Sequence, residues 1–322
     1  MRTCGLALVA VLCLAAQASG AASGRVTPAK AVRICAAAGP FWPTETLAPN
    51  GRTAWIACKE QSRLLALDLA TGGRVATLRL GAPVTAVATG GGWVWALDGE
   101  STLYRVDARR ARVTKRIGLP AIAAYNIWYG GGAVWVADDQ GAKVFRVSPA
   151  TGKVVARINV GNGPADMAFA AGRAWVIDHR DRTLFRINLA TNRPTRLATV
   201  GEGGAAPERL VMLGGNLWIT GRGVPLLQVD PDTGATKRTI DVDGTGIDVV
   251  AAAGDLWVPV RTAAVDRTGF PTMTALRRVT TGGSVTTAAT ASGRVDVHGL
   301  AAGRGYVWLA DNTGGFLYRV AT

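Results

Sequence analysis

Residues 131–138 read Gly-Gly-Ala-Val-Trp-Val-Ala-Asp, a glycine turn followed by a short apolar strand centred on a tryptophan. Variants of this phrase recur along the chain, and their tryptophans are separated by 40, 40, 40, 43, 39 and 51 residues. The seven tryptophans are Trp55, Trp95, Trp135, Trp175, Trp218, Trp257 and Trp308. A period of about 40 residues indicates a repeat architecture in which one small unit is used many times.

Each repeat contains the same four segments. A weakly alternating segment such as 164–169 precedes the glycine turn and the tryptophan strand. A third segment such as 103–107 follows, and a turn leads to a fourth such as 154–158. Short runs of Val, Ile, Leu and aromatic residues, bounded by Gly, Pro, Asn and Asp, are typical of strands and turns. Four strands in about 40 residues predict an all-β, seven-bladed β-propeller of four-stranded blades.

The two ends of the chain predict how the ring closes. The last repeat stops after its third strand, at residues 317–320, and residues 31–34 resemble the missing fourth strand. We therefore predict that the N-terminal strand completes the last blade. Closure of this kind also protects sheet edges that would otherwise pair with other chains.

The first 22 residues have the features of a secretory signal. Arg2 precedes an apolar run from Leu6 to Ala16, and small residues follow at 18–22. We expect residues 1–22 to be a signal peptide and residues 23–322 to form the propeller, which would be secreted, either extracellular or periplasmic, with no membrane span after cleavage. The alternative is an uncleaved anchor, although the apolar run is shorter than the ~20 residues that span a bilayer.

The remaining cysteines suggest a staple across the closure. Signal removal leaves Cys35 and Cys58, and an even pair in an exported protein predicts a disulfide. The predicted strands bring both residues to the same rim of the ring. A bridge there would contribute about 2–4 kcal/mol to stability. The alternative is two buried thiols.

Composition limits the class of protein and of partner. The chain has 322 residues, 48% of them hydrophobic, with 41 glycines and a net charge of +14. This excludes a disordered chain, and the absence of a Gly-X-Y period excludes collagen. The basic residues are scattered along the third and fourth strands without interleaved aromatics, so no nucleic-acid partner is expected. Attraction to an anionic cell envelope fits the charge, and a monomer is expected.

The loop face of the ring is the expected ligand site. It carries the starts of the first strands and the ends of the tryptophan strands. The long connection at 261–274 leaves the same face, and long loops in compact domains are often functional. Our candidate ligand-binding residues are Tyr125, Asn126, Asp166, Arg209, Asp248, His298 and, from this connection, Phe270.

A metal site is a second expectation for this face. Asp166, Asp248 and Asp178 could supply oxygen ligands to Ca²⁺ or Mg²⁺. Convergence of these carboxylates and His298 within ~2.3–2.6 Å of one point would favour the metal. The alternative is that an aspartate at a strand end binds the backbone of its own turn.

The repeat resembles known propeller families. Residues 131–138 and 147–155 resemble YVTN/YncE-type repeats, those of virginiamycin B (streptogramin) lyase and, more distantly, gluconolactonase and NHL propellers. Two fragments resemble the lyase in particular, His298-Gly299-Leu300 and Asp178-His179. In that family, histidines and glutamates on neighbouring blades hold Mg²⁺, and a histidine acts as the base that opens a lactone by elimination.

The resemblance makes His298 the candidate catalytic residue, but the chain departs from the lyase pattern. His179 and His298 fall on the fourth and seventh blades, and the glutamates are replaced by aspartate or are missing. A general base must reach the same substrate as its partners. We therefore expect a non-catalytic propeller that binds a small molecule, an extracellular protein or an envelope component on its loop face. The alternative is a divalent-cation-dependent lyase or lactone hydrolase.

Overall fold

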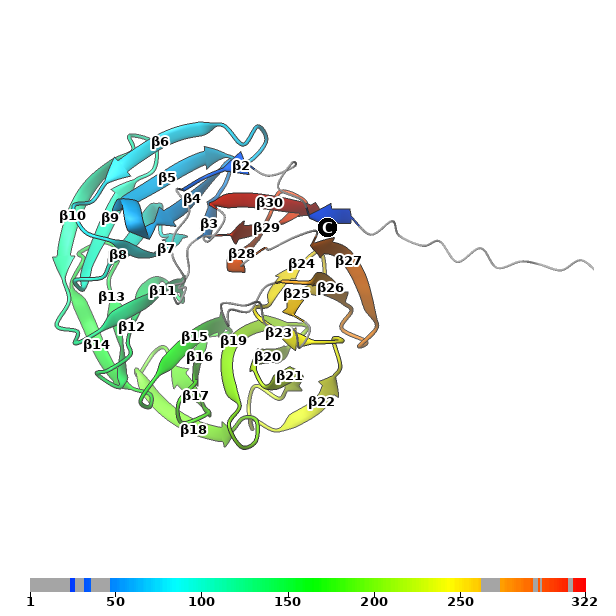
Figure 1. Cartoon of the computed structure of the whole chain (residues 1–322). Coiled ribbons are helices and arrows are strands. Elements are labelled where there is room, and N and C mark those ends of the chain that lie inside the picture. Colours follow the sequence, from blue (N-terminus) through cyan, green and yellow to red (C-terminus); the bar gives the residue numbers. More distant parts are fainter. Residues whose placement is uncertain are drawn as a thin grey trace, which may run out of the picture.

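The computed structural model describes residues 24–26, 32–35, 47–261, 273–291, 295, 297–311 and 315–322. Its strands form seven sheets arranged as blades around a central axis, and the chain passes once around the ring (Figure 1). The seven-bladed β-propeller predicted from the tryptophan spacing is confirmed. Within the described ranges, no helix is long and apolar enough to cross a membrane.

The first five blades share one plan, with the strands in sequence order from the axis to the outer wall and each antiparallel to the next. Blade one contains β3 (Leu47–Asn50), β4 (Thr53–Cys58), the short 3-10 helix η2 (Lys59–Gln61), β5 (Arg63–Asp68) and β6 (Arg74–Arg79). Blade two contains β7 (Val84–Gly90), β8 (Trp93–Asp98), β9 (Thr102–Asp107) and β10 (Arg112–Gly118). Blade three contains β11 (Ala124–Gly130), β12 (Ala133–Asp138), β13 (Lys143–Val147) and β14 (Val154–Asn159). Blade four contains β15 (Pro164–Ala170), β16 (Arg173–Asp178), β17 (Thr183–Asn188) and β18 (Arg193–Thr199). Blade five contains β19 (Ala206–Leu213), β20 (Asn216–Arg222), β21 (Val224–Val229) and β22 (Thr236–Ile240).

Blade six departs from this plan at both edges. It contains β23 (Thr245–Gly246), β24 (Val250–Ala252), β25 (Asp255–Arg261), β26 (Ala275–Val279) and β27 (Val285–Ala291). The two short strands β23 and β24 both pair with β25. Pro259 of β25 lies between the two paired stretches and has no N–H to donate to a neighbouring strand. At the outer edge, β1 (Gly24–Val26) pairs with β27 in parallel. This extra strand was not expected from the repeat pattern.

The N-terminal strand closes the ring as predicted. Blade seven contains β28 (Val297–Gly303), β29 (Tyr306–Asp311), β30 (Phe316–Ala321) and β2 (Val32–Arg33). The outermost strand, β2, is antiparallel to β30, with Val32 opposite Leu317. A strand near the start of the chain and the last strand of the chain therefore lie in one sheet.

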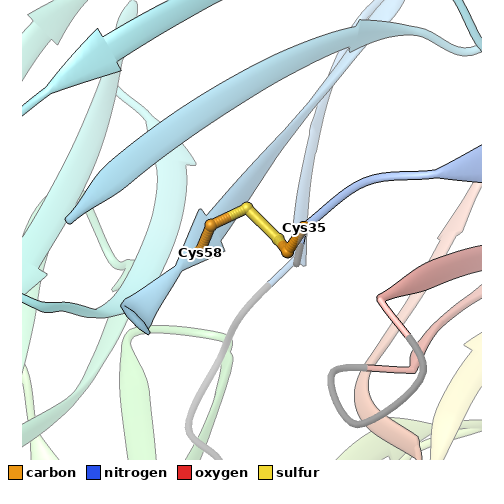
Figure 2. The surroundings of a disulfide bond; sticks show 2 residues. All are labelled: Cys35 and Cys58. Atoms are coloured by element: carbon orange, nitrogen blue, oxygen red, sulfur yellow. A yellow bond between two sulfur atoms is a disulfide. The ribbon is translucent and has the colours of Figure 1, made fainter. Parts of the chain in front are cut away.

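A disulfide fastens the closing strand to blade one. Cys35 follows β2 and Cys58 is the last residue of β4 (Figure 2). Their sulfurs are bonded, and their Cα atoms lie 5.6 Å apart. The cross-link thus joins the last blade of the ring to the first.

The seven blade tryptophans are core residues, each at most 3% exposed. Five of the indole N–H groups donate to the carbonyl five residues earlier, at 3.0–3.2 Å, across the glycine turn that precedes the strand. These five are Trp95, Trp135, Trp218, Trp257 and Trp308. Each indole therefore holds the turn of its own blade while its ring packs in the core.

An arginine opposite the tryptophan joins several blades to the next. Arg146 lies opposite Trp135, with its guanidinium carbon 5.4 Å from the ring centre. Its Nη1 donates to the Leu189 carbonyl at 2.6 Å and to Asn192 Oδ1 at 2.7 Å, both in blade four. Arg105, Arg186 and Arg319 bind the corresponding turns of blades three, five and one. We call this contact the arginine latch.

Candidate functional site

β-Bulges shape the start of the innermost strand in five blades. The register of β15 with β16 shifts between Pro164 and Asp166, and corresponding shifts occur in β7, β11, β19 and β28. A bulge bends the strand and re-aims the side chain that follows it. The residue two places before the partner of the blade tryptophan occupies an equivalent position around the ring. In blades two to seven this position holds Ala86, Asn126, Asp166, Arg209, Asp248 and Gly299.

Four of these residues make polar contacts to the neighbouring blade or to one another, and we call them the polar arc: Asn126, Asp166, Arg209 and Asp248. Asn126 Nδ2 donates to the carbonyl of Ala165 in blade four at 2.7 Å. The Leu210 N–H of blade five donates to Asp166 Oδ2 at 2.8 Å. Arg209 Nε lies 3.4 Å from Asp248 Oδ1 in blade six. The arc joins blades three to six by polar contacts at their inner ends.

Asp166 is the centre of the arc. Its Oδ1 accepts from Trp128 Nε1 at 2.8 Å and from the Met167 N–H at 2.7 Å. Together with the Leu210 N–H on Oδ2, its donors come from three consecutive blades. The residue is only 7% exposed. A single carboxyl group thus links blades three, four and five.

Burial perturbs both carboxyl groups of the arc. It raises the pKa of Asp166 to about 7, against the opposing charge of Arg209 and with a smaller contribution from Asp248. Burial also raises the pKa of Asp248, and Arg209 again opposes the shift. Because a positive charge favours the ionised form of a nearby carboxyl, Arg209 stabilises both residues in their charged forms.

The flanks of the arc are more accessible than its centre. In blade five, Arg222 Nη2 lies 2.9 Å from Glu208 Oε1, with 50% and 26% of the two side chains exposed. In blade three, Tyr125 is 41% exposed, and Ile122 just before the strand is 71% exposed. Burial lowers the pKa of Arg261 at the end of β25. The loop face therefore presents an aromatic ring, an apolar side chain and an ion pair around a buried centre.

Asp178, one of the predicted metal ligands, binds its own turn. Its Oδ1 accepts from the N–H groups of Arg180 and Asp181, both at 2.8 Å. Its Oδ2 accepts from the Gly163 N–H at 2.8 Å, and the residue is fully buried. The end of a tryptophan strand thus uses its aspartate to hold two adjacent loops, as the turn alternative describes.

The described residues do not assemble the predicted Ca²⁺ or Mg²⁺ site. Within the described ranges, no three His, Cys, Asp or Glu side chains are placed to hold a metal ion. Arg209 interacts with both Asp166 and Asp248, so a guanidinium supplies the positive charge that a cation would bring. The three-aspartate set fails because Asp178 is directed to its turn and the other two carboxyls share an arginine.

The remaining predicted residues divide into three groups. Tyr125, Asn126, Arg209 and Asp248 lie on the loop face, at or beside the arc. The backbone of His298 lies in the bulge of β28 between Val297 and Gly299, but its side chain is outside the described part of the chain. Phe270 is also outside the described residues.

Trp128, which was not among the predicted site residues, is a partner of Asp166. Its indole N–H is one of the three donors to that carboxyl. The available signal was a tryptophan outside the repeated position, in the inner strand Ala-Tyr-Asn-Ile-Trp-Tyr-Gly of blade three. A polar group on a residue otherwise suited to the core indicates a buried partner.

Comparisons with known proteins support the architecture. No protein-family model and no curated protein matches the chain. Among solved structures, virginiamycin B lyase from Staphylococcus aureus aligns with a TM-score of 0.72 at 17% identity, over 86% of this chain and 94% of the lyase. A catalytically inactive variant of that lyase with quinupristin gives 0.73 at 15%, over 92% and 97%. BamB from Moraxella catarrhalis gives 0.61 at 12%, over 86% and 82%. At these identities the likeness concerns the fold, and it identifies the chain as a β-propeller similar in architecture to these proteins.

Proposed function

We propose that this chain is a secreted, non-catalytic β-propeller that binds a ligand or a protein partner on its loop face. This proposal rests on one observation: the polar groups of the arc are bound by other groups of the protein itself. Asp166 accepts three hydrogen bonds from the protein itself, and Asp248 binds Arg209. Groups held in this way form a rigid frame for a binding surface, whereas a general base needs to reach the substrate.

The accessible flanks indicate the chemistry of the ligand. Tyr125 and Ile122 offer an aromatic ring and an apolar side chain in blade three. Glu208 and Arg222 offer a partly exposed ion pair in blade five. Binding sites commonly combine apolar or aromatic contacts with a few polar groups that fix orientation. We therefore expect a ligand with an apolar or aromatic ring and polar groups at its edge.

The test is a binding screen with a matched pair of variants. The purified protein is titrated with a panel of cyclic and aromatic peptides, with quinupristin as one member, and binding is measured by calorimetry. Tyr125→Ala should weaken binding about tenfold, as expected for loss of an aromatic contact. Val155→Ala removes a comparably exposed apolar side chain from β14 on the outer wall and should leave affinity unchanged. Equal effects of the two variants, or no binding by any member, would contradict the proposal.

The lyase or lactone-hydrolase alternative has one observation in its favour. Asp166 has a pKa raised to about 7, so it exchanges protons near neutral pH. The test is incubation with quinupristin and Mg²⁺, followed by chromatography. Elimination opens the lactone ring without a change of mass, whereas hydrolysis adds one water. An opened product that disappears in Asp166→Asn would replace the binding proposal with an enzyme.

Secretion is tested separately. The proposal rests on residues 1–22, with their positive start, apolar run and small residues. N-terminal sequencing of the exported protein should begin near residue 23. A chain that retains its first 22 residues and sediments with membranes would indicate an anchor instead.

A further inference from the structure

The outer wall of the first five blades is uniformly basic. Strands β6, β10, β14, β18 and β22 are the outermost strands of these blades and follow one another around the ring (Figure 1). They contain ten basic residues, all exposed, and no acidic residue. The ten are Arg74, Arg79, Arg112, Lys115, Arg116, Arg157, Arg193, Arg196, Lys237 and Arg238. We call this set the basic rim.

Blade six differs from the first five at its outer edge. Its long outer strand β27 reads Val-Thr-Thr-Ala-Ala-Thr-Ala and carries no charge. This uncharged edge is covered by β1. The acidic residues near the outer strands lie in turns instead, where Asp107 and Asp230 accept hydrogen bonds from turn N–H groups. The outermost strands of blades six and seven, β1 and β2, each contain one arginine, Arg25 and Arg33, so no outermost strand of the ring contains an acidic residue.

Little of this charge is neutralised by the protein itself. In the described ranges, Lys237 is the single rim residue with an ion pair, at 2.8 Å from Asp230. Arg238 donates to a backbone carbonyl, that of Gly282, at 2.6 Å, and Arg196 donates to Thr199 Oγ1 at 2.8 Å. These neutral acceptors leave the guanidinium charges uncompensated, so the rim is an extended surface of positive potential.

We propose that the basic rim binds a flexible linear polyphosphate chain that follows the wall across several blades. The curvature of the outer wall favours a flexible chain over a flat membrane as the partner. A flat anionic membrane would touch the convex wall of a ring at only one or two blades. A flexible chain bends with the wall and meets the basic residues of successive blades. The contact is electrostatic, and it displaces the counterions of the polyanion.

Protection of sheet edges accounts for only part of the pattern. Charged side chains on an edge strand discourage pairing with other chains. Acidic residues would serve that purpose as well, and the chain has 22 of them. Exclusion of acidic residues from all five strands indicates an anionic partner in addition to edge protection.

The experiment measures binding of fluorescently labelled linear polyphosphate to the purified protein by anisotropy at several salt concentrations. We expect the logarithm of the affinity to fall linearly with the logarithm of salt, with a slope of about −0.7 for each contact to a flexible chain. The charge-reversal variant Arg112→Glu, Arg157→Glu should bind about tenfold more weakly at low salt and give a shallower slope. Because its edges stay charged, the variant should remain monomeric.

The control variant also reverses two charges, at residues that lie outside the basic rim. Arg52→Glu, Arg304→Glu changes two exposed arginines in the turns of blades one and seven. This variant should retain affinity within about twofold if the rim is the site. Equal losses in both double variants would show a response to net charge and overturn the proposal. Binding to anionic vesicles without binding to polyphosphate would also overturn it.

The loop-face variant keeps this inference separate from the proposed function. Tyr125→Ala should leave polyphosphate binding unchanged, because Tyr125 belongs to an inner strand. Loss of polyphosphate binding in Tyr125→Ala, with the rim variants unaffected, would move the polyanion to the loop face and reject the rim.

Discussion

Blades three to six and blade one are fastened by different chemistry. Blades three to six are linked at their inner ends by the polar arc, in which Asp166 and Arg209 bind the neighbouring blades. Blade one is linked to blade seven by the covalent bond between Cys35 and Cys58. One side of the ring is thus held by buried charges whose strength depends on pH. The other side is held by a bond whose survival depends on redox conditions.

The arginine latches also differ between these two regions of the ring. In blade three, Arg146 lies over Trp135 and binds blade four. In blade one, Ala66 takes the place of the arginine opposite Trp55. In the described part of the chain, the indole N–H of Trp55 also has no hydrogen-bond partner. The difference shows that a propeller needs shape-compatible blades everywhere but polar fasteners at only some interfaces.

The largest expected effect comes from breaking the arc. Asp166→Ala leaves the indole N–H of Trp128 and the Leu210 N–H without their acceptor and removes a charge near Arg209. Removal of one partner from a buried charged network costs about 3–5 kcal/mol. Urea unfolding should therefore show a loss of about 4 kcal/mol. Ala86→Gly at the equivalent place in blade two is the control and should cost about 1 kcal/mol. Equal losses would mean that the arc does not fasten the ring.

Removal of the covalent link should have the next largest effect. Cys35→Ser, Cys58→Ser opens a loop of sequence separation 23 and should cost about 3 kcal/mol in urea unfolding. Reduction of the unmodified protein should reproduce the loss, and reductant should not affect the double variant. A stability that does not respond to reductant would show that the bond contributes nothing to ring closure.

The two sides should also respond differently to pH. A carboxyl whose pKa is raised by folding binds more protons in the folded state, so its contribution to stability is present at low pH and is lost as pH rises through the folded value. The pKa of Asp166 is raised to about 7 from 3.8, and that of Asp248 is raised in the same direction. For Asp166 alone, we expect a loss of about 2–3 kcal/mol between pH 5 and pH 8. Urea unfolding at the two values checks this, and Asp166→Asn should flatten the dependence. Stability that rises over the same interval would contradict the assignment.

The smallest effects concern the latches. Arg146→Ala removes a guanidinium from the Trp135 ring and two hydrogen bonds to blade four, and should cost about 1–2 kcal/mol. Ala66→Arg should lower stability by about 1–3 kcal/mol, because Ala66 is buried in the core and the turn of blade two that a latch would bind carries Arg109 and Arg110. Thermal unfolding of both variants checks this pair. A clear gain from Ala66→Arg would show that the basic turn does not repel a latch.

Much of the fold could be predicted because it depends on a repeated pattern. The tryptophan period determined the number of blades, and the missing last strand predicted closure by β2. By contrast, β1 has only three residues and no alternation, so nothing in its sequence distinguished it from a loop. Its pairing with β27 depends on the uncharged edge of a strand far along the chain.

The site was predictable in position but not in contacts. Counting back from each tryptophan located Asn126, Asp166, Arg209 and Asp248 on the loop face. The count could not show that Asp166 and Asp248 share Arg209, because that depends on the bulges and on the contact between blades. The count also could not distinguish Asp178 from these residues. An aspartate that binds its own turn and an aspartate that binds a ligand look alike in the sequence.

The closing strand has a consequence for the order of events during synthesis. Val32 leaves the ribosome well before Leu317, its partner in β30. Cys35 and Cys58 are both near the beginning of the chain, so their bond can form before blade seven exists. The bond then keeps β2 beside blade one while the other blades fold in turn. We expect the half-made protein to carry its own docking strand in place, so that arrival of β30 completes the ring with little further search.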